Sequence, residues 1–359
     1  MPSRLVGVRR AWHTDPMTSP APENPPASPG TPPAPPGATL GDVGEDGVLA
    51  ALLAALPAAG PEVRVGPGDD AAVSTLNGDL VSTTDMLVEG EDFLPAWTDP
   101  HQLGIKAAAQ NLADVHAMGA APHGMLLTIG APADTPLSFV RELMAGFSEE
   151  TARGGAQVLG GDLSGGPVVI ISVTALGTLA AHPPVLRSGA QPGDAIVLAG
   201  TVGRAAAGLD LLLADPDLAD ASDPALREPI DVQRSPRPDY AAAARIAGAA
   251  HAMIDVSDGL VGDLGRIAAA SGITADLDPS ALDALAAPLQ AAADHLGTGA
   301  SPRDWVLHGG EDHGFLATVP ADQVPVGWMR IGTCRAASDD GGVTLAGQPV
   351  TGGSFRHFG

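Results

Sequence analysis

The sequence predicts an α/β protein built from two domains, and three observations support this. The chain has 359 residues and is 45% hydrophobic. Single hydrophobic cores stop growing at shorter chain lengths, so two domains are expected. Helix and strand patterns alternate along both halves. Between the halves, residues 182–194 (HPPVLRSGAQPGD) have the composition of a loop. We therefore expect an N-terminal domain over 41–180 and a C-terminal domain over 190–359.

The first residues, 1 to about 40, differ from the rest of the chain. They hold eleven of the 34 prolines, show no apolar periodicity and carry little hydrophobic mass. Such a segment cannot bury enough apolar surface to order its backbone, so we expect a disordered, proline-rich tail. Arg9 and Arg10 precede no apolar run, so a secretory signal is not expected.

The N-terminal domain opens with an expected helix over 44–56, followed by a strand over 78–87 that runs into a turn. Thr98 or Asp99 offers an N-cap, and Pro100 stands in the first turn of a second helix that stops at Gly119. Then follow a buried strand over 124–130, a helix over 137–155, and strands over 156–162 and 167–177.

The C-terminal domain repeats this alternation. The pattern predicts a strand over 194–200, helices over 204–214 and 239–250, a strand over 252–257, a helix over 260–272 and a strand over 314–320. The turn GTVGRAAAG at 200–208 lies between a strand and a helix, where backbone amides are able to bind an anion.

The charge balance limits the partners. The chain has 42 Asp plus Glu against 18 Lys plus Arg, a formal charge of −24, and it assembles no basic patch. Nucleic acid and membrane surfaces are therefore not expected as partners. The single cysteine, Cys334, forms no internal disulfide, and we expect a cytoplasmic protein.

Aspartates in small-residue turns are the main functional signal. Carboxylates beside tight backbone suit hard divalent cations and the phosphates they bridge. A lone aspartate in such a turn is more often a cap or turn residue, so the set matters more than any member. The set is Asp69, Asp70, Asp85, Asp114, Asp162, Asp255 and Asp258. Asp69 and Asp70 face opposite ways in an extended chain, and we expect Asp70 to be the ligand.

Other catalytic signatures are absent or weak. The sequence contains no HExxH motif, no GxxxxGK[ST] loop and no GxSxG elbow. Carboxylate pairs of the glycosidase kind stay open, although such enzymes do not need this many acidic turns.

Two basic residues have open interpretations. Lys106 is the only lysine, and in a helix it shares a face with Gln110 and Asp114, which indicates either a salt-bridged surface helix or a specific role. Arg187 is either a phosphate-binding fork or a linker charge.

Seven blocks in order resemble the thiamine-monophosphate kinase family: GPGDDAAV, STTDMLVEGEDF, IKAAAQNLADVHAMGA, GGDLSGG, RSGAQPGD, IDVSDGLVGDL and HGGEDHGF. The resemblance covers about 40–358 and includes the closing GGSFRHF. It implies the two-domain α/β fold of the aminoimidazole ribonucleotide synthetase superfamily, with an N-terminal domain that binds metal and nucleotide and forms a homodimer.

The resemblance also implies a reaction and its residues. Thiamine monophosphate and ATP give thiamine diphosphate and ADP by direct in-line phosphoryl transfer, with several Mg²⁺ ions and no catalytic residue beyond the metal ligands. The implied metal ligands are Asp70, Thr83, Thr84, Asp85, Asp114, Asp162, Asp255 and Asp258. The implied nucleotide contacts are Gly161, Arg187 and Ser257, and the implied contacts to the thiamine substrate are Asp92, Glu311 and Phe355.

Two departures from the family pattern fall, by the resemblance, on the substrate side. Asp92 replaces a usual histidine, and His313 and Gly314 replace a usual aromatic residue and acid. The alternatives are another ATP-using enzyme of the superfamily, close to aminoimidazole ribonucleotide synthetase, and a non-catalytic nucleotide-binding protein.

Overall fold

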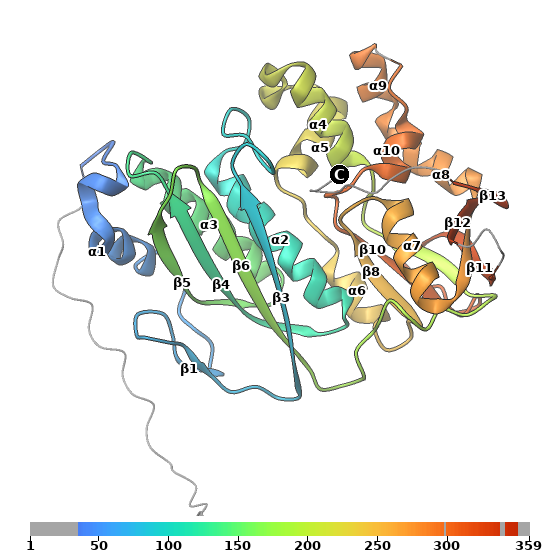
Figure 1. Ribbon diagram of the computed structural model, residues 1–359, viewed down its shortest axis with the longest axis horizontal. Coiled ribbons are helices and arrows are strands. Elements are labelled where there is room, and N and C mark those ends of the chain that lie inside the picture. Colours follow the sequence, from blue (N-terminus) through green and yellow to red (C-terminus); the bar gives the residue numbers. More distant parts are fainter. Residues whose placement is uncertain (1–34, 298, 338–341, 351–359) are drawn as a thin grey trace, which may run out of the picture.

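The computed structural model describes residues 35–350, except 298 and 338–341 (Figure 1). Most of the expected tail lies outside the described residues. Its expected end at about 40 is too late, because Ala38 is already buried and its carbonyl accepts a bond from Leu137 N at 2.9 Å. Thr39 forms a capping box with Asp42, and this places the start of helix α1 (Leu40–Leu53) four residues earlier than predicted.

The expected two-domain α/β architecture is confirmed. The N-terminal domain has a four-stranded sheet in the order β3 (Asp79–Val88), β6 (Ile170–Leu179), β4 (Ala121–Ala131) and β5 (Gln157–Gly165). Only the β4–β5 pair is parallel. A small hairpin of β1 (Val63–Val65) and β2 (Val73–Ser74) precedes it.

Helices α2 (Pro100–Ala117) and α3 (Leu137–Arg153) pack closely against each other. The Asp99 carboxylate caps α2 by accepting a bond from Gln102 N at 2.8 Å, as the sequence predicts. A Cβ atom on Gly104 would lie 2.0 Å from the Leu143 carbonyl oxygen, so only glycine permits this approach. The tight packing fixes α2, which carries the expected site residue Asp114.

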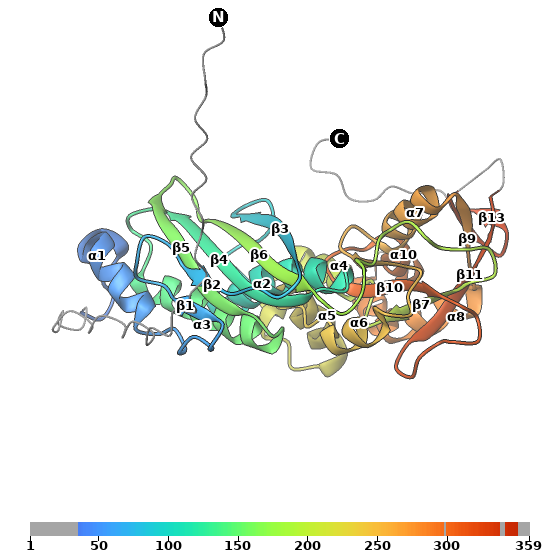
Figure 2. The same ribbon diagram turned by 90° about the horizontal axis from the view of Figure 1, so that it is seen from below.

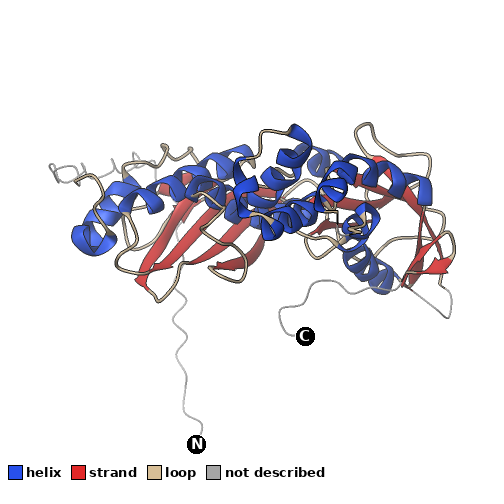
Figure 3. Cartoon of the chain, turned by 90° about the horizontal axis from the view of Figure 1, so that it is seen from above, coloured by secondary structure: helices blue, strands red, loops and turns tan. Residues whose placement is uncertain are grey.

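The four-stranded sheet is covered on one face only. Figure 3 shows the helices of this domain on one side of the strands, and the other side carries no described helix. Side chains of β3 alternate accordingly: Thr83 and Asp85 are half-buried on the helix side, whereas Thr84 and Met86 are exposed. Leu80, Met86 and Leu126 are large apolar side chains left exposed in these strands.

The C-terminal domain has a seven-stranded sheet with helices around it. The strand order is β13 (Gln348–Pro349), β12 (Gly342–Leu345), β9 (Ile273–Leu277), β11 (Met329–Ala336), β7 (Ala195–Ala199), β10 (Gly314–Val319) and β8 (Ala252–Val256). The helices are α4 (Arg204–Ala214), α5 (Pro224–Arg234), α6 (Tyr240–Ile246), α7 (Leu260–Ser271), α8 (Pro279–Ala286), α9 (Gln290–Leu296) and α10 (Pro302–His308). Two short 3-10 helices lie at Pro216–Asp220 and Ala287–Leu289. None of the described helices is long and apolar enough to cross a bilayer.

The apolar core continues across the domain boundary. Val197, Phe315 and Ala317 of the C-terminal sheet belong to the same buried cluster as the inner face of α2. In return, Trp97 of the N-terminal domain is buried in the core of the C-terminal domain. Helix α2 therefore lies where the two domains meet (Figures 1 and 2), and side chains from both reach it.

Candidate active site

Four aspartates near the domain boundary are electrostatically coupled. Asp85 comes from β3, Asp114 from α2, Asp255 from β8 and Asp258 from the turn that follows β8. Burial raises the pKa of Asp85, and the charges of Asp255 and Asp258 raise it further. Four of the expected metal ligands, two from each domain, are thus close enough for their charges to act on one another.

Asp114 is the most perturbed member of this acid cluster. Burial is the largest cause, and the charges of Asp255 and Asp85 add to it, so that its pKa rises to about 7. Thr83 Oγ1 donates a hydrogen bond to Asp114 Oδ2 at 2.7 Å and lowers the pKa only in part. The hydroxyl of Thr83 therefore lies beside the Asp114 carboxylate.

The segments 256–258 and 310–313 of the C-terminal domain pack backbone to backbone. Glu311 N donates to Ser257 O at 2.9 Å, and His313 N donates to Val256 O at 3.1 Å. A Cβ atom on Gly310 would lie 2.1 Å from the Ser257 oxygen, so the loops leave no room for a side chain there. Glu311 and His313 have φ angles of 68° and 53°, a strained conformation for residues with a side chain.

His313 contacts the acid cluster directly. Its Nδ1 lies 3.1 Å from Asp255 Oδ2, and both side chains are buried. Burial lowers the pKa of His313, but the bond to Asp255 and its charge outweigh burial and leave the pKa above its ordinary value. His313, one of the departures from the family pattern, therefore contacts an expected metal ligand.

Asp263 and Arg266 support Asp258 and were not predicted. Asp263 Oδ2 accepts a hydrogen bond from Asp258 N at 3.0 Å, and Arg266 pairs with both carboxylates. Burial raises the pKa of Asp263 to about 7. The sequence feature that could have indicated Asp263 is its place as the third acid in the block IDVSDGLVGDL, five residues after Asp258.

The donor set of the cluster fits a hard divalent cation. Its oxygens are carboxylates, which Mg²⁺ prefers. Burial is the main cause of the raised pKa values of Asp85 and Asp114, and the charges of neighbouring aspartates add to it. Among the described residues, no three Asp, Glu, His or Cys side chains are already gathered as a metal site. The cluster therefore supplies suitable ligands without forming a closed cage by itself.

Other expected metal and nucleotide residues lie outside the cluster. Thr84 is on the exposed face of β3, and its hydroxyl donates to Val173 O at 2.7 Å. Gly161 and Asp162 are exposed on β5, at the other edge of the sheet. Three strand spacings separate β3 from β5, which is about 14 Å.

The remaining expected residues are also spread out. Asp70 is exposed beyond β1, and its amide donates to Asp69 Oδ1 at 2.9 Å. Arg187 is exposed in the 182–194 loop. The Asp92 carboxylate accepts a bond from Val88 N at 2.8 Å and so closes the turn after β3. Phe355 lies outside the described residues.

Lys106 is not on a surface helix. Its side chain is 2% exposed, and its Nζ lies 3.1 Å from Glu311 Oε1 and donates to Gln233 O at 3.1 Å. The salt-bridged surface helix considered from the sequence is therefore wrong. The partners of Lys106 come from the other domain, where helical spacing gives no signal.

The start of helix α4 is already occupied by a side chain. Asp312 accepts bonds from Arg204 N at 3.1 Å and Ala205 N at 3.0 Å. Burial raises the pKa of Asp312 to about 6. The GTVGRAAAG turn thus has an anion from the protein itself, and the structure does not leave these two amides free for a ligand.

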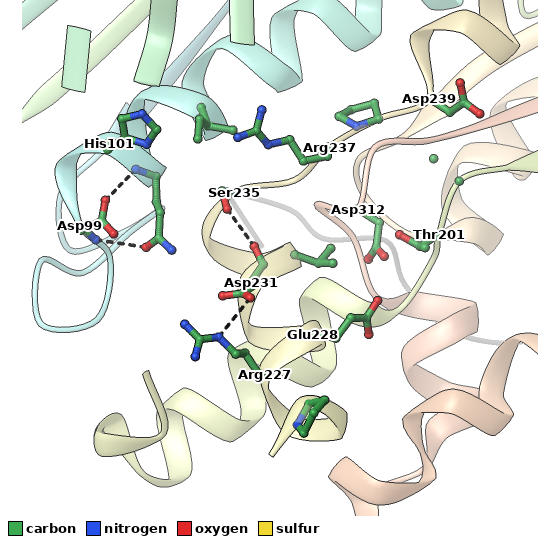
Figure 4. Close-up of a pocket in the computed structure, with 17 residues that line it drawn as sticks. Asp99, His101, Thr201, Arg227, Glu228, Asp231, Ser235, Arg237, Asp239 and Asp312 are labelled. Carbon is green, nitrogen blue, oxygen red and sulfur yellow. Dashed lines mark hydrogen bonds and ion pairs between the residues drawn. The ribbon is translucent and has the colours of Figure 1, made fainter. Parts of the chain in front are cut away.

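A cavity of about 800 Å³ opens between α2, α5 and the 200–201 loop (Figure 4). The arginines that line it form ion pairs with carboxylates of the protein: Arg227 pairs with Asp231, and Arg237 pairs with Glu149 and Glu150. Asp99 and Asp312, which also line it, cap helices. These charged groups already have partners within the protein, so the acid cluster is the stronger candidate site.

Comparison with known proteins agrees with the fold. The model of AIR synthase related protein, N-terminal domain, matches residues 68–179, and that of AIR synthase related protein, C-terminal domain, matches residues 191–338. Together with the acid cluster between the domains, these matches define a two-domain AIR synthase related protein.

Similar curated proteins show which family within this class the chain belongs to. A thiamine-monophosphate kinase of Mycobacterium tuberculosis is 43% identical over 300 residues, covering 83% of this chain and 86% of the relative. One of Corynebacterium glutamicum is 41% identical over 330 residues, covering 89% and 95%. The solved structure described as AaThiL complexed with AMPPCP and TMP is 30% identical, with a TM-score of 0.71 over 81% of this chain and 91% of that one. The chain belongs to the thiamine-monophosphate kinase family.

Proposed function

We propose that this chain transfers the γ-phosphoryl group of ATP to the phosphate of thiamine monophosphate, giving thiamine diphosphate and ADP. The observation that carries the proposal is the electrostatic coupling across the domain boundary of Asp85 with Asp255 and Asp258, and of Asp114 with Asp255. Such a transfer asks the protein mainly to align two phosphates and to neutralise their charge. Family membership and the AMPPCP and TMP complex of a similar structure support the choice of substrates.

In this proposal the four aspartates hold Mg²⁺. Magnesium held there would supply positive charge to neutralise the phosphoryl oxygens. The chain's own residues keep the carboxylates in place: Thr83 bonds Asp114, His313 bonds Asp255, and Arg266 pairs with Asp258. Without a cation, an acidic site in a protein of charge −24 would repel both substrates.

The proposal also includes a homodimer formed through the open face of the N-terminal sheet. Leu80, Met86 and Leu126 are exposed on this sheet, and β3 and β5 are its free edges. Thr84, Gly161 and Asp162 would then lie at or near the interface of two copies. Sedimentation should give a dimer for the wild type and a monomer for Leu80→Glu/Met86→Glu; an unchanged dimer would contradict this interface.

The nucleotide and acceptor contacts are proposed from the family pattern. Gly161, Arg187 and Ser257 contact ATP, and Asp70 adds a metal ligand. Asp92, Glu311 and Phe355 contact thiamine monophosphate, Asp92 through the carboxylate that also closes the turn after β3. We propose that the enzyme acts in the cytoplasm, in keeping with its single, buried cysteine.

The test is ADP formation with ATP, Mg²⁺ and thiamine monophosphate. We expect turnover with this acceptor, none with formylglycinamidine ribonucleotide, and none in excess chelator. Turnover only with the second acceptor would favour the synthetase alternative, and binding of ATP without turnover would favour a non-catalytic protein. Asp85→Asn and Asp114→Asn should each reduce turnover by about a hundredfold or more.

A further inference from the structure

Lys106 is the only lysine in the chain, and its side chain is buried. It belongs to α2 of the N-terminal domain, yet its two partners, Glu311 Oε1 and the Gln233 carbonyl, belong to the C-terminal domain and both lie at 3.1 Å. A buried ammonium is costly unless its hydrogen bonds are satisfied. The position therefore calls for a specific reason.

The same contacts fix both oxygens of Glu311. Oε1 faces Lys106, and Oε2 accepts a hydrogen bond from Gln233 Nε2 at 2.9 Å. The side chain of Glu311 is nevertheless 37% exposed, so the held carboxylate still reaches solvent. Burial alone would raise the pKa of Glu311, but Lys106 and Gln233 outweigh burial and leave it below its ordinary value. Glu311 is thus kept ionised and in one orientation.

Stability alone is a weak explanation for this ion pair. Buried ion pairs often add nothing to stability when compared with apolar residues of similar size. Glu311 also has a strained backbone, with φ at 68°, and it stands two residues before His313, which bonds Asp255 of the acid cluster. Strain of this kind is common at functional sites. The pair therefore adjoins the proposed active site.

We propose that Lys106 is the positioning residue of the acceptor subsite: from across the domain boundary it holds the Glu311 carboxylate, together with Gln233, in the orientation that meets the cationic ring of thiamine monophosphate. This role rests on the proposed function. A carboxylate already held in its binding orientation loses less conformational freedom when the substrate binds.

The test is a double-mutant cycle of Lys106→Met, Glu311→Gln and both together. Each single variant should raise the KM for thiamine monophosphate about tenfold, with kcat and the KM for ATP within about twofold of wild type. If Lys106 acts through Glu311, the double variant should match Glu311→Gln alone rather than show the product of both effects. Calorimetric binding of thiamine monophosphate should give the same pattern in Kd.

The double variant also distinguishes a folding defect from a loss of positioning. Lys106→Met leaves a carboxylate without its cation, whereas the double variant removes both charges and should fold at least as well as Lys106→Met. A matched control is Arg237→Met, which breaks another ion pair between the domains, to Glu149 and Glu150. Its KM for thiamine monophosphate should stay within about twofold of wild type.

Several outcomes would overturn the proposal. Multiplied effects in the double variant would show that Lys106 acts independently of Glu311. An equal rise of KM in Arg237→Met would show that any loosening of the domain boundary is enough. Both results presuppose a wild type that turns over thiamine monophosphate. A wild type without turnover would instead refute the proposed function, and the positioning role with it.

Discussion

Replacing Asp114 with asparagine should stabilise the protein when no divalent metal is present. Burial, with the charges of Asp255 and Asp85, raises the pKa of this carboxyl from 3.8 to about 7. At about 1.4 kcal/mol per pKa unit, the shift costs the fold about 4 kcal/mol once the carboxyl is ionised. Asparagine has no charge and still offers Thr83 an oxygen acceptor, so it should recover up to about 4 kcal/mol.

The stability gained by Asp114→Asn should increase as the pH rises. Between pH 3.8 and about 7 the unfolded chain releases a proton that the folded protein keeps, so the wild type loses stability across this window. The advantage of Asp114→Asn should be about 1.5 kcal/mol at pH 5 and about 4 kcal/mol at pH 8. Urea unfolding in chelator at both pH values measures it.

Asp79→Asn is the matched control, because Asp79 is exposed on β3 and its replacement changes the net charge equally. The reasoning is refuted if Asp114→Asn gains no more than this control, or gains equally at pH 5 and pH 8. Saturating Mg²⁺ should then stabilise the wild type more than Asp114→Asn, because ligands stabilise the state they bind. Equal stabilisation would remove Asp114 from the metal ligands.

Three further predictions concern other parts of the chain. Asp312→Ala should lower the free energy of unfolding by about 1 to 2 kcal/mol in urea, because α4 loses its cap; an unchanged value would mean that water replaces it. Tyr240→Phe should cost about 1 to 3 kcal/mol, since Glu150 loses a buried donor at 2.8 Å, while a changed KM for thiamine monophosphate would link this network to the site. Deleting residues 1–34 should leave the melting temperature and kcat within error, and a loss of either would show that the segment docks.

Helix α2 shows what the sequence could predict. An N-cap at Thr98 or Asp99, Pro100 in the first turn and a stop at Gly119 are local signals. The structure confirms this helix and shows Asp99 as its N-cap. The strand that carries Asp85 was equally clear. Such features depend on neighbours a few residues apart, which one sequence displays directly.

The assembly of the site depends on contacts that local patterns do not reveal. Asp85, Asp114 and Asp255 lie on separate elements. Their shared small-residue turns placed them in one candidate set of seven, but did not show which members lie near one another. Lys106 illustrates the limit most clearly. Helical spacing placed it beside Gln110 and Asp114, whereas its partner Glu311 comes from the other domain. Asp312 likewise caps α4 from more than a hundred residues away.

The departures from the family pattern at 313 and 314 have a structural reason in this chain. Gly314 leaves no room for a side chain, because a Cβ atom would lie 2.4 Å from the Thr201 carbonyl oxygen. His313 bonds Asp255, and its charge lowers the pKa values of Asp85 and Asp114, which burial and their neighbours raise. An uncharged aromatic residue would give the acid cluster no such relief. His313 thus contributes to the charge balance of the acid cluster.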